Sequence, residues 1–273
     1  MTESTYKITL IGCGRMGGAM LKGWLESDIP ATYNIVEPFG QPEFTIGNPK
    51  ITYGKEVKDI KAEIEDSNIC LLAVKPQMMM EVCESLKHII EDDCLILSVA
   101  AGQTIANFDN YFGVDQPIIR VMPNTPAAIG KGMSVAVANP NATDAHKDIV
   151  TRMLNCSGKT EWIEDENLMN AVTAVSGSGP AYIFHLIEAL AKAGEHVGLE
   201  SDAAMTLARQ TVIGSAALAE KEADTSASTL RENVTSPKGT TAAALDVLMD
   251  GRFQVILDEA LSAAKKRGEE LEG

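Results

Sequence analysis

The chain has 273 residues, enough for one large domain or two ordinary ones, and 45% of them are hydrophobic and 22% charged. This composition excludes a disordered chain, a collagen and a small disulfide-stabilised scaffold. With 38 acidic and 23 basic residues the formal net charge is −15, so we expect neither nucleic acid nor a membrane surface as a partner.

The cysteines and histidines indicate a reducing compartment and no metal site. The five cysteines are odd in number and form no C-x-x-C pair, which predicts reduced thiols and a cytoplasmic protein. The four histidines are scattered without the spacing of metal ligands. No run of about 18 apolar residues is present, so we expect no membrane span.

Short apolar runs alternate with helical stretches in residues 1–163. Strands are predicted at 7–11, 33–37, 68–74, 94–99, 117–122, 133–138 and 159–163, and helices at 15–27, 56–66, 142–155 and from Pro76 onward. This alternation, with nearly continuous apolar strands, predicts an α/β fold with a parallel sheet covered on both faces.

Residues 164–273 show a different pattern, rich in alanine and without a convincing strand. Ser201 and Asp202 indicate a helix start, and small residues at helical spacing allow helices to approach closely. We expect either a separate all-helical domain or a segment that fills a groove in another subunit.

The strongest local motif is the glycine pattern Gly12-x-Gly14-x-x-Gly17, which follows a predicted strand and opens a predicted helix. In a dinucleotide-binding turn, Gly12 permits the tight bend, Gly14 lets the backbone approach a pyrophosphate, and Gly17 lets the helix pack on the strand. A free helix N-terminus then binds an anion despite the net charge. The pattern predicts an N-terminal Rossmann-like domain over residues 1–163; the alternative is a glycine turn without a ligand.

Glu37 ends the second predicted strand, where a carboxylate accepts hydrogen bonds from a ribose 2′-hydroxyl and repels a 2′-phosphate. This favours NADH over NADPH. Two residues oppose the inference, because Pro38 can turn Glu37 away and Arg15 can attract a phosphate. A solvated turn glutamate is the alternative.

Three further segments follow predicted strands: Ala73–Pro76, Ser98–Gly102 and the double-proline segment Arg120–Pro126. Ligands of open α/β sheets lie beyond the carboxyl ends of the strands. These segments are therefore candidates for the ribose and nicotinamide side of a cofactor site, with a stiff connection as the alternative for the proline segment.

Thr235–Gly239 form a polar loop between two predicted helices, and Thr240 or Thr241 is expected to cap the second one. Hydroxyls and uncommitted N–H groups at a helix N-terminus suit a carboxylate. The stretch around Ser178 is similar, and it either lines a pocket or forms a tight interdomain turn.

Taken with their order and spacing, these motifs resemble those of the pyrroline-5-carboxylate reductases, which carry out the last step of proline synthesis. The resemblance covers nearly the whole chain and rests on Gly12–Gly17, Ala73–Pro76, Ala100–Gly102, Met122–Pro126, Ala174–Ala181 and Val234–Thr241. It implies a dinucleotide-binding domain (1–163), a helical substrate-binding and dimerisation domain (164–273), NADPH or NADH as cofactor, and homodimers that assemble into decamers.

The resemblance also implies roles for individual residues. The residues implied to bind the cofactor, together with Gly17 and Glu37 from the motif analysis, are Ile11, Gly12, Cys13, Gly14, Arg15, Met16, Ala73, Val74, Lys75, Pro76, Val99, Ala100, Ala101 and Asn233. Those expected to bind the substrate are Ser178, Ser236, Gly239, Thr240 and Thr241. In this scheme, Gly239 and Thr240 give N–H groups to the substrate carboxylate, and Thr241 places its hydroxyl on the ring nitrogen as the catalytic residue.

The sequence departs from the family pattern at Lys238, where the family usually has glycine. An acidic substrate contact is expected before Leu230, and Glu222 and Asp224 both compete for it. Two other functions stay open at this stage: a 3-hydroxyacid dehydrogenase, although the lysine expected after the glycine pair comes only at Lys192, and a non-catalytic nucleotide sensor.

Overall fold

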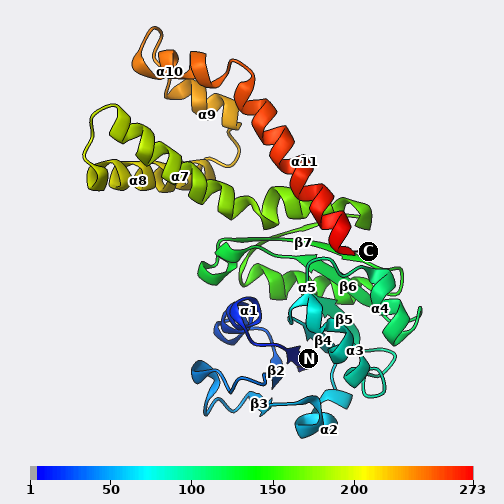
Figure 1. The fold of residues 1–273 in the computed structure, drawn as a ribbon. Coiled ribbons are helices and arrows are strands. Elements are labelled where there is room, and N and C mark those ends of the chain that lie inside the picture. The colour runs from blue at the N-terminus through cyan, green and yellow to red at the C-terminus, as the bar shows by residue number, and fades with distance from the viewer. Residues whose placement is uncertain (1–4, 273) are drawn as a thin grey trace. The chain divides into compact units, whose positions relative to one another are not determined.

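A computed structural model describes residues 5–272 in two compact units (Figure 1). The first unit contains the chain up to Gly177 and, in addition, the residues from Ala264 onward. The second contains Ser178–Ala263. The sequence prediction set its domain boundary at residue 163, whereas residues 164–177 pack with the first unit.

An eight-stranded sheet forms the first unit, in the order β3-β2-β1-β4-β5-β6-β7-β8. Strands β1 to β6 pair in parallel, which is the doubly wound arrangement of dinucleotide-binding folds. The strands are β1 Tyr6–Ile11, β2 Ala31–Val36, β3 Ile51–Gly54, β4 Ile69–Leu72, β5 Leu95–Ser98, β6 Ile118–Met122, β7 Gly132–Ala138 and β8 Gly158–Trp162. The predicted α/β fold is confirmed.

Helices cover both faces of this sheet because its central strands are apolar on both sides. The helices of this unit are α1 Arg15–Glu26, α2 Lys61–Glu65, α3 Met79–Leu86, α4 Ile105–Phe112, α5 Asp144–Asn155 and α6 Met169–Val172. The core on one face contains α1 and α5, and the core on the other contains α2, α3 and α4. Trp24 of α1 is 1% exposed, and its indole N–H donates to the carbonyl of Met153 in α5 at 2.9 Å.

Four details of this sheet unit differ from the sequence prediction. Strand β3 and helix α4 were not predicted, and the helix expected at 56–66 is a 3-10 turn, Val57–Ile60, followed by the short α2. Strand β7 runs antiparallel to β6. The connection from Met122 to Gly132 is shorter than the dozen or so residues that a parallel crossover needs, so the chain can only return in the opposite direction.

The second unit is helical. It contains α7 Gly179–His196, α8 Ser201–Lys221, α9 Ala227–Asn233, α10 Thr240–Leu248 and the first part of α11 Arg252–Glu272. The small side chains of Ala191, Ala204 and Ala208 are buried where α7 and α8 pack together. Large apolar side chains on these two helices stay exposed in the single chain, among them Phe184, Leu190 and Leu207. The described part of residues 164–272 contains no strand, as predicted.

The five cysteines are free, and four of them, Cys13, Cys70, Cys83 and Cys94, are buried. Among the described residues, no helix combines the length and the apolar character required to cross a bilayer.

The last turn of α11 returns to the first unit and meets an ion cluster there. Arg120 of β6, whose side chain is 5% exposed, donates to Glu166 at 2.9 Å and to Glu272 at 2.7 Å. Burial, and then the nearby Glu166 carboxylate, raise the pKa of Asp109 in α4. One carboxylate oxygen of Asp109 is buried without a hydrogen-bond partner among the described residues.

This raised pKa predicts that Asp109→Asn stabilises the protein at neutral pH. A carboxyl whose pKa is raised by folding contributes stability below its unfolded pKa, about 3.9, and loses that contribution as the pH rises through the folded value. We expect the Tm of the variant at pH 7–8 to rise, because the amide removes the unfavourable charge from the cluster. The gain should disappear near pH 4.

Thermal unfolding followed by circular dichroism between pH 4 and 8 provides the measurement. The exposed Asp115→Asn is the matched control, because it makes the same charge change outside the cluster. A gain for Asp109→Asn that is the same at every pH would contradict the assignment to this carboxyl.

Candidate functional site

The glycine-rich turn joins β1 to α1 at the carboxyl edge of the sheet. Gly12 adopts φ +91°, in the left-handed region that favours glycine. Its N–H donates to the carbonyl of Val36 at 2.9 Å, which ties the turn to the end of β2. The turn therefore lies where parallel α/β sheets bind their ligands.

The other two positions of the motif, Gly14 and Gly17, carry glycine for different physical reasons. A Cβ on Gly17 would lie 2.3 Å from the carbonyl oxygen of Gly12, so this position needs glycine for helix and turn to pack. A Cβ on Gly14 would have no atom within 4 Å. Folding places no steric limit on Gly14, and its open side is the surface that a pyrophosphate would approach.

Helix α1 begins at this turn without a side-chain cap, because its N-cap residue is Gly14. Helices α4 and α5, by contrast, have their first turns capped by the side chains of Thr104 and Thr143. The first-turn N–H groups of α1 are therefore left without a side-chain acceptor, and together with the positive end of the helix dipole they are an arrangement that suits an anion.

Glu37 is fixed against the glycine turn. One of its carboxylate oxygens accepts the N–H of Cys13 at 2.8 Å, and the other accepts the N–H of Phe39 at 3.2 Å. Pro38 therefore does not turn the carboxylate away from the turn. Burial, and then this carboxylate, raise the pKa of the Cys13 thiol to about 12, so the thiol stays protonated and is not a nucleophile at neutral pH.

The ends of β4 and β5 lie next to the turn. The N–H of Ala73 donates to the carbonyl of Ile11 at 2.8 Å, and the N–H of Val99 donates to the carbonyl of Leu72 at 3.2 Å. The structure thus gathers at one edge of the sheet the predicted cofactor segments 11–17, 73–76 and 99–101, together with Glu37.

A cavity of about 700 Å³ continues from the turn. Its lining includes Ile11, Gly12, Val36 and Val74, and also three lysines that the sequence analysis did not single out, Lys55, Lys58 and Lys61. Apolar walls beside an uncapped helix N-terminus fit the adenosine end of a dinucleotide.

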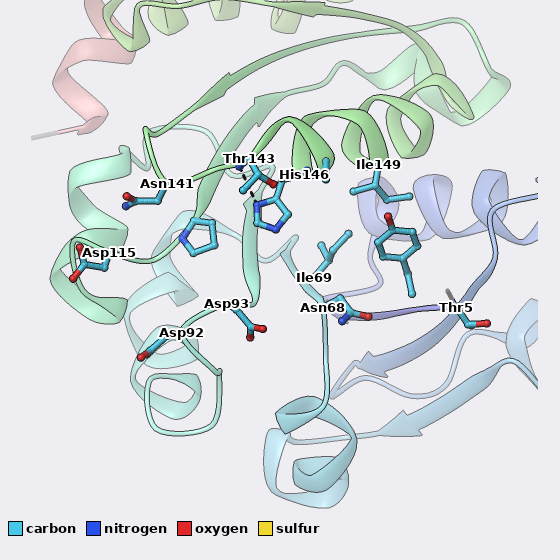
Figure 2. A pocket seen from close by; sticks show the side chains of 13 residues that line it. Thr5, Asn68, Ile69, Asp92, Asp93, Asp115, Asn141, Thr143, His146 and Ile149 are labelled. Atoms are coloured by element: carbon cyan, nitrogen blue, oxygen red, sulfur yellow. Dashed lines mark hydrogen bonds between the residues drawn. The ribbon is translucent and has the colours of Figure 1, made fainter. Parts of the chain in front are cut away.

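A second cavity, of about 600 Å³, lies at the amino ends of β1, β4 and β6 (Figure 2). Asp92, Asp93 and Asp115 line it, together with His146, whose ring accepts the N–H of Thr143 at 3.3 Å. The carboxylates repel phosphates, and this edge of the sheet is the wrong one for a dinucleotide. Nor do the described residues contain a cluster of three or more side chains suited to hold a metal ion.

The substrate loop expected from the sequence lies in the second unit, between α9 and α10. Its helix α10 begins at Thr240 with Gly239 as N-cap and with no side-chain cap, so the expectation that Thr240 or Thr241 caps the helix is wrong. The first-turn amides of α10 are therefore open, as those of α1 are.

Two backbone features of this loop refine the prediction. The N–H of Gly239 donates to the carbonyl of Ser236 at 3.0 Å, so it is already committed and is not a free donor for a carboxylate. Lys238 has φ +59° and is the one non-glycine residue with positive φ in the described chain. This left-handed conformation, which costs a residue with a Cβ about 1 kcal/mol or more, explains why the family pattern has glycine there.

Ser178 precedes α7 at the N-cap position, but its side chain makes no capping hydrogen bond. The turn before it, Thr173–Gly177, is a π-helix, an irregularity common at functional sites. It is held by Asn124, whose side chain donates to the carbonyl of Ser176 at 3.2 Å and accepts the N–H of Met133 at 2.9 Å. Asn124 lies between the two prolines of the 120–126 segment. The prolines pointed to this segment in the sequence, but nothing in the sequence indicated that Asn124 holds the turn before α7.

The remaining predicted site residues belong to the second unit. Asn233 is the last residue of α9. Glu222 and Asp224, the two candidates for an acidic substrate contact, are both exposed between α8 and α9, and the choice between them stays open.

A glycine turn between β1 and α1, beside the reversal of strand order from β1 to β4, is the dinucleotide site of a doubly wound sheet, and with the matches below it places the chain among the nucleotide-dependent oxidoreductases. Residues 7–102 match the family described as NADP oxidoreductase, coenzyme F420-dependent, and residues 166–271 match pyrroline-5-carboxylate reductase dimerisation. Pyrroline-5-carboxylate reductases from Pseudomonas aeruginosa and Haemophilus influenzae are 36% and 38% identical to the chain. The alignments cover 98% and 97% of this chain, and 97% of each relative. The chain belongs to the pyrroline-5-carboxylate reductase family.

Solved structures agree with this assignment. A pyrroline-5-carboxylate reductase from Coxiella burnetii matches with a TM-score of 0.89 and 32% identity, over 99% of this chain and all of that one. The Plasmodium falciparum enzyme, solved with NADP bound, matches with a TM-score of 0.78 and 28% identity, over 98% of both chains. The predicted family is confirmed.

The contrast between two glycines gives a test of the cofactor site. We expect Gly14→Ala to leave the Tm unchanged, because its Cβ meets no atom within 4 Å. The same methyl would occupy the pyrophosphate approach, so the Kd for NADH and NADPH should rise by on the order of tenfold or more. Isothermal titration calorimetry gives the Kd.

Gly17→Ala is the comparison variant, and it should lower the Tm, since its Cβ meets the turn itself. Cofactor binding by Gly14→Ala as tight as that of the unmodified protein would place the pyrophosphate elsewhere.

Proposed function

We propose that this chain reduces 1-pyrroline-5-carboxylate to L-proline with NAD(P)H, in the cytoplasm. The observation that carries the proposal is the pair of glycine N-caps, Gly14 and Gly239, each of which leaves the first turn of a helix without a side-chain cap. One such turn suits the pyrophosphate of a dinucleotide and the other the carboxylate of a small amino-acid-like substrate. Family membership over the whole chain supports the same pairing.

The reaction needs little acid–base machinery from the protein. When bound, NAD(P)H supplies a hydride from C4 of its nicotinamide to C5 of the protonated cyclic imine. The C=N double bond becomes a single bond, and its electron pair becomes the lone pair of the ring nitrogen. The protein has to hold the two carbons in contact and aligned, which is where orientation supplies rate.

Thr240 and Thr241 have separate roles in this proposal. The backbone N–H of Thr240, with the other first-turn amides and the hydroxyl of Ser236, binds the substrate carboxylate. The Thr241 hydroxyl donates a hydrogen bond to the ring nitrogen as the lone pair forms there. Gly239 contributes conformation rather than a donor, because its N–H already binds Ser236.

Self-association follows from the helical unit. Its match to the reductase dimerisation family covers residues 166–271, and exposed apolar side chains such as Phe184, Leu190 and Leu207 need a partner surface. We propose a homodimer formed through these helices, and a decamer of five dimers as the larger assembly.

The alternative function is a non-catalytic nucleotide sensor, and an experiment can distinguish it from a reductase. It would bind NADH without consuming it in the presence of the imine. Loss of NADH absorbance with 1-pyrroline-5-carboxylate, together with proline formation, separates the two functions. Full NADH binding without turnover would overturn the proposed reaction.

Thr241→Ala tests the catalytic assignment. We expect kcat/KM for the imine to fall by on the order of 100-fold, with the fold retained, because the hydrogen bond to the nitrogen is lost. Thr240→Ala is the matched control, since it removes a neighbouring hydroxyl but keeps the backbone N–H assigned to the carboxylate. Equal kinetics for the two variants would remove Thr241 from the mechanism.

Glu37 supports a preference for NADH. Both of its oxygens are anchored by backbone N–H groups at the glycine turn, so its charge cannot move away from a 2′-phosphate. We expect the Kd for NADH to be roughly tenfold lower than that for NADPH. Glu37→Gln should bring the two values within about threefold of each other by removing that charge.

Calorimetric Kd values for both cofactors provide the measurement. Glu81→Gln is the control, because Glu81 lines the same cavity away from the turn. Tighter NADPH binding by the unmodified protein would show that Lys55, Lys58 and Lys61, rather than Glu37, set the preference.

A further inference from the structure

The C-terminal turn of α11 is docked into the sheet unit by specific polar contacts. Glu272 pairs through one oxygen with the buried Arg120 at 2.7 Å, and its other oxygen accepts the side-chain N–H of Asn170 at 2.7 Å. Its side chain is only 19% exposed. Both oxygens of the last carboxylate in the described chain are therefore held by residues far away in sequence.

Charge neutralisation alone does not explain this contact. Glu166 already pairs with Arg120 at 2.9 Å, so Glu272 brings a second negative charge to a single guanidinium. It also lies at the carboxyl end of a helix, where the helix dipole disfavours an anion and favours a cation. Arg120 offsets both the carboxylate and the helix end, and the contact holds the helix end in place.

Two glycines leave room for the last turn of α11 to pack against the sheet unit. A Cβ on Gly102 would lie 3.1 Å from the carbonyl oxygen of Leu271, so the backbone of the last turn lies directly against Gly102. A Cβ on Gly268 would lie 2.5 Å from the side-chain oxygen of Asn170, so a larger residue in α11 would displace the asparagine that binds Glu272. The ion pair, the hydrogen bond and the close packing at the two glycines thus all favour the same position for the last turn of α11.

This position borders the segment that follows β5. Gly102 ends the stretch Val99–Ala101, which is assigned to the nicotinamide side of the cofactor site. Beyond it, the N–H of Ile105, the first residue of α4, donates to Glu166 at 2.9 Å. The segment 99–105 is thus held at Gly102 by Leu271 and at Ile105 by the carboxylate that shares Arg120 with Glu272.

We propose that Glu272 is a positioning residue of the cofactor site, and that the C-terminal turn of the chain holds segment 99–102 in its binding conformation. The inference rests on the proposed cofactor site. It assigns to the last turn of α11 a part in dinucleotide binding, exerted through Arg120 and Gly102 without contact with the cofactor.

The test compares Glu272→Gln with Glu270→Gln. Glu270 lies two residues earlier in the same helix and pairs with the exposed Arg267 at 2.7 Å, so it is a matched control. Without cofactor, hydrogen exchange of the amides in segment 99–105 should become faster by on the order of tenfold in Glu272→Gln and stay unchanged in Glu270→Gln. The Kd for NADH, measured by calorimetry, should rise by on the order of five- to tenfold.

A second variant that ends at Glu270 removes the docked residues altogether and should reproduce both effects. Glu272→Asp keeps the charge and should restore part of the NADH affinity. In steady-state kinetics, the KM for the cofactor should rise while kcat and the KM for the imine stay within about twofold. This split separates positioning of the cofactor segment from a general loss of folded enzyme.

Unchanged exchange in segment 99–105, or an unchanged NADH Kd, in both Glu272→Gln and the shortened chain would overturn the inference. So would equal changes in Glu270→Gln. The exchange and binding measurements do not involve the imine. A protein that binds NADH but fails to reduce the imine would therefore contradict the proposed reaction and leave the docking test intact.

Discussion

In the proposed reaction, backbone amides at two helix N-termini bind anions against a net charge of −15. Glycine stands at the N-caps of α1 and α10, where α4 and α5 have a threonine side chain that caps the helix. The bare amides keep their partial positive charge and stay accessible. The doubly wound sheet positions the first of these sites at the end of β1, and the polar loop after α9 positions the second.

Much of the fold was predictable because its signals are local. The apolar runs of β1, β4 and β5 and the glycine pattern each stand within a few residues of sequence. Strand β3 was missed because this edge strand is only partly buried and its sequence, Ile51-Thr-Tyr-Gly54, forms no continuous apolar run. The antiparallel direction of β7 depends on the length of a connection rather than on the composition of the strand, so an apolar run alone did not reveal it.

The candidate site likewise has a part that could be predicted from local motifs and a part that could not. The glycine turn, Glu37 and segment 73–76 were found from motifs, and the structure brings them to one edge of the sheet. The commitment of the Gly239 amide to Ser236 and the lysines of the adjoining cavity depend on the folded backbone. Arg120 and Glu272 are 152 positions apart, a separation at which single-sequence patterns carry no information.

The docking of α11 also bears on the order in which the protein can be completed during synthesis. Ribosomes deliver the sheet unit first, and such a unit begins to fold as it emerges. Of the two carboxylates that pair with Arg120 in the described residues, Glu166 is synthesised early, whereas Glu272 follows 152 positions after Arg120. The nascent sheet unit therefore lacks the contact at Gly102 until the last turn of α11 has also been synthesised.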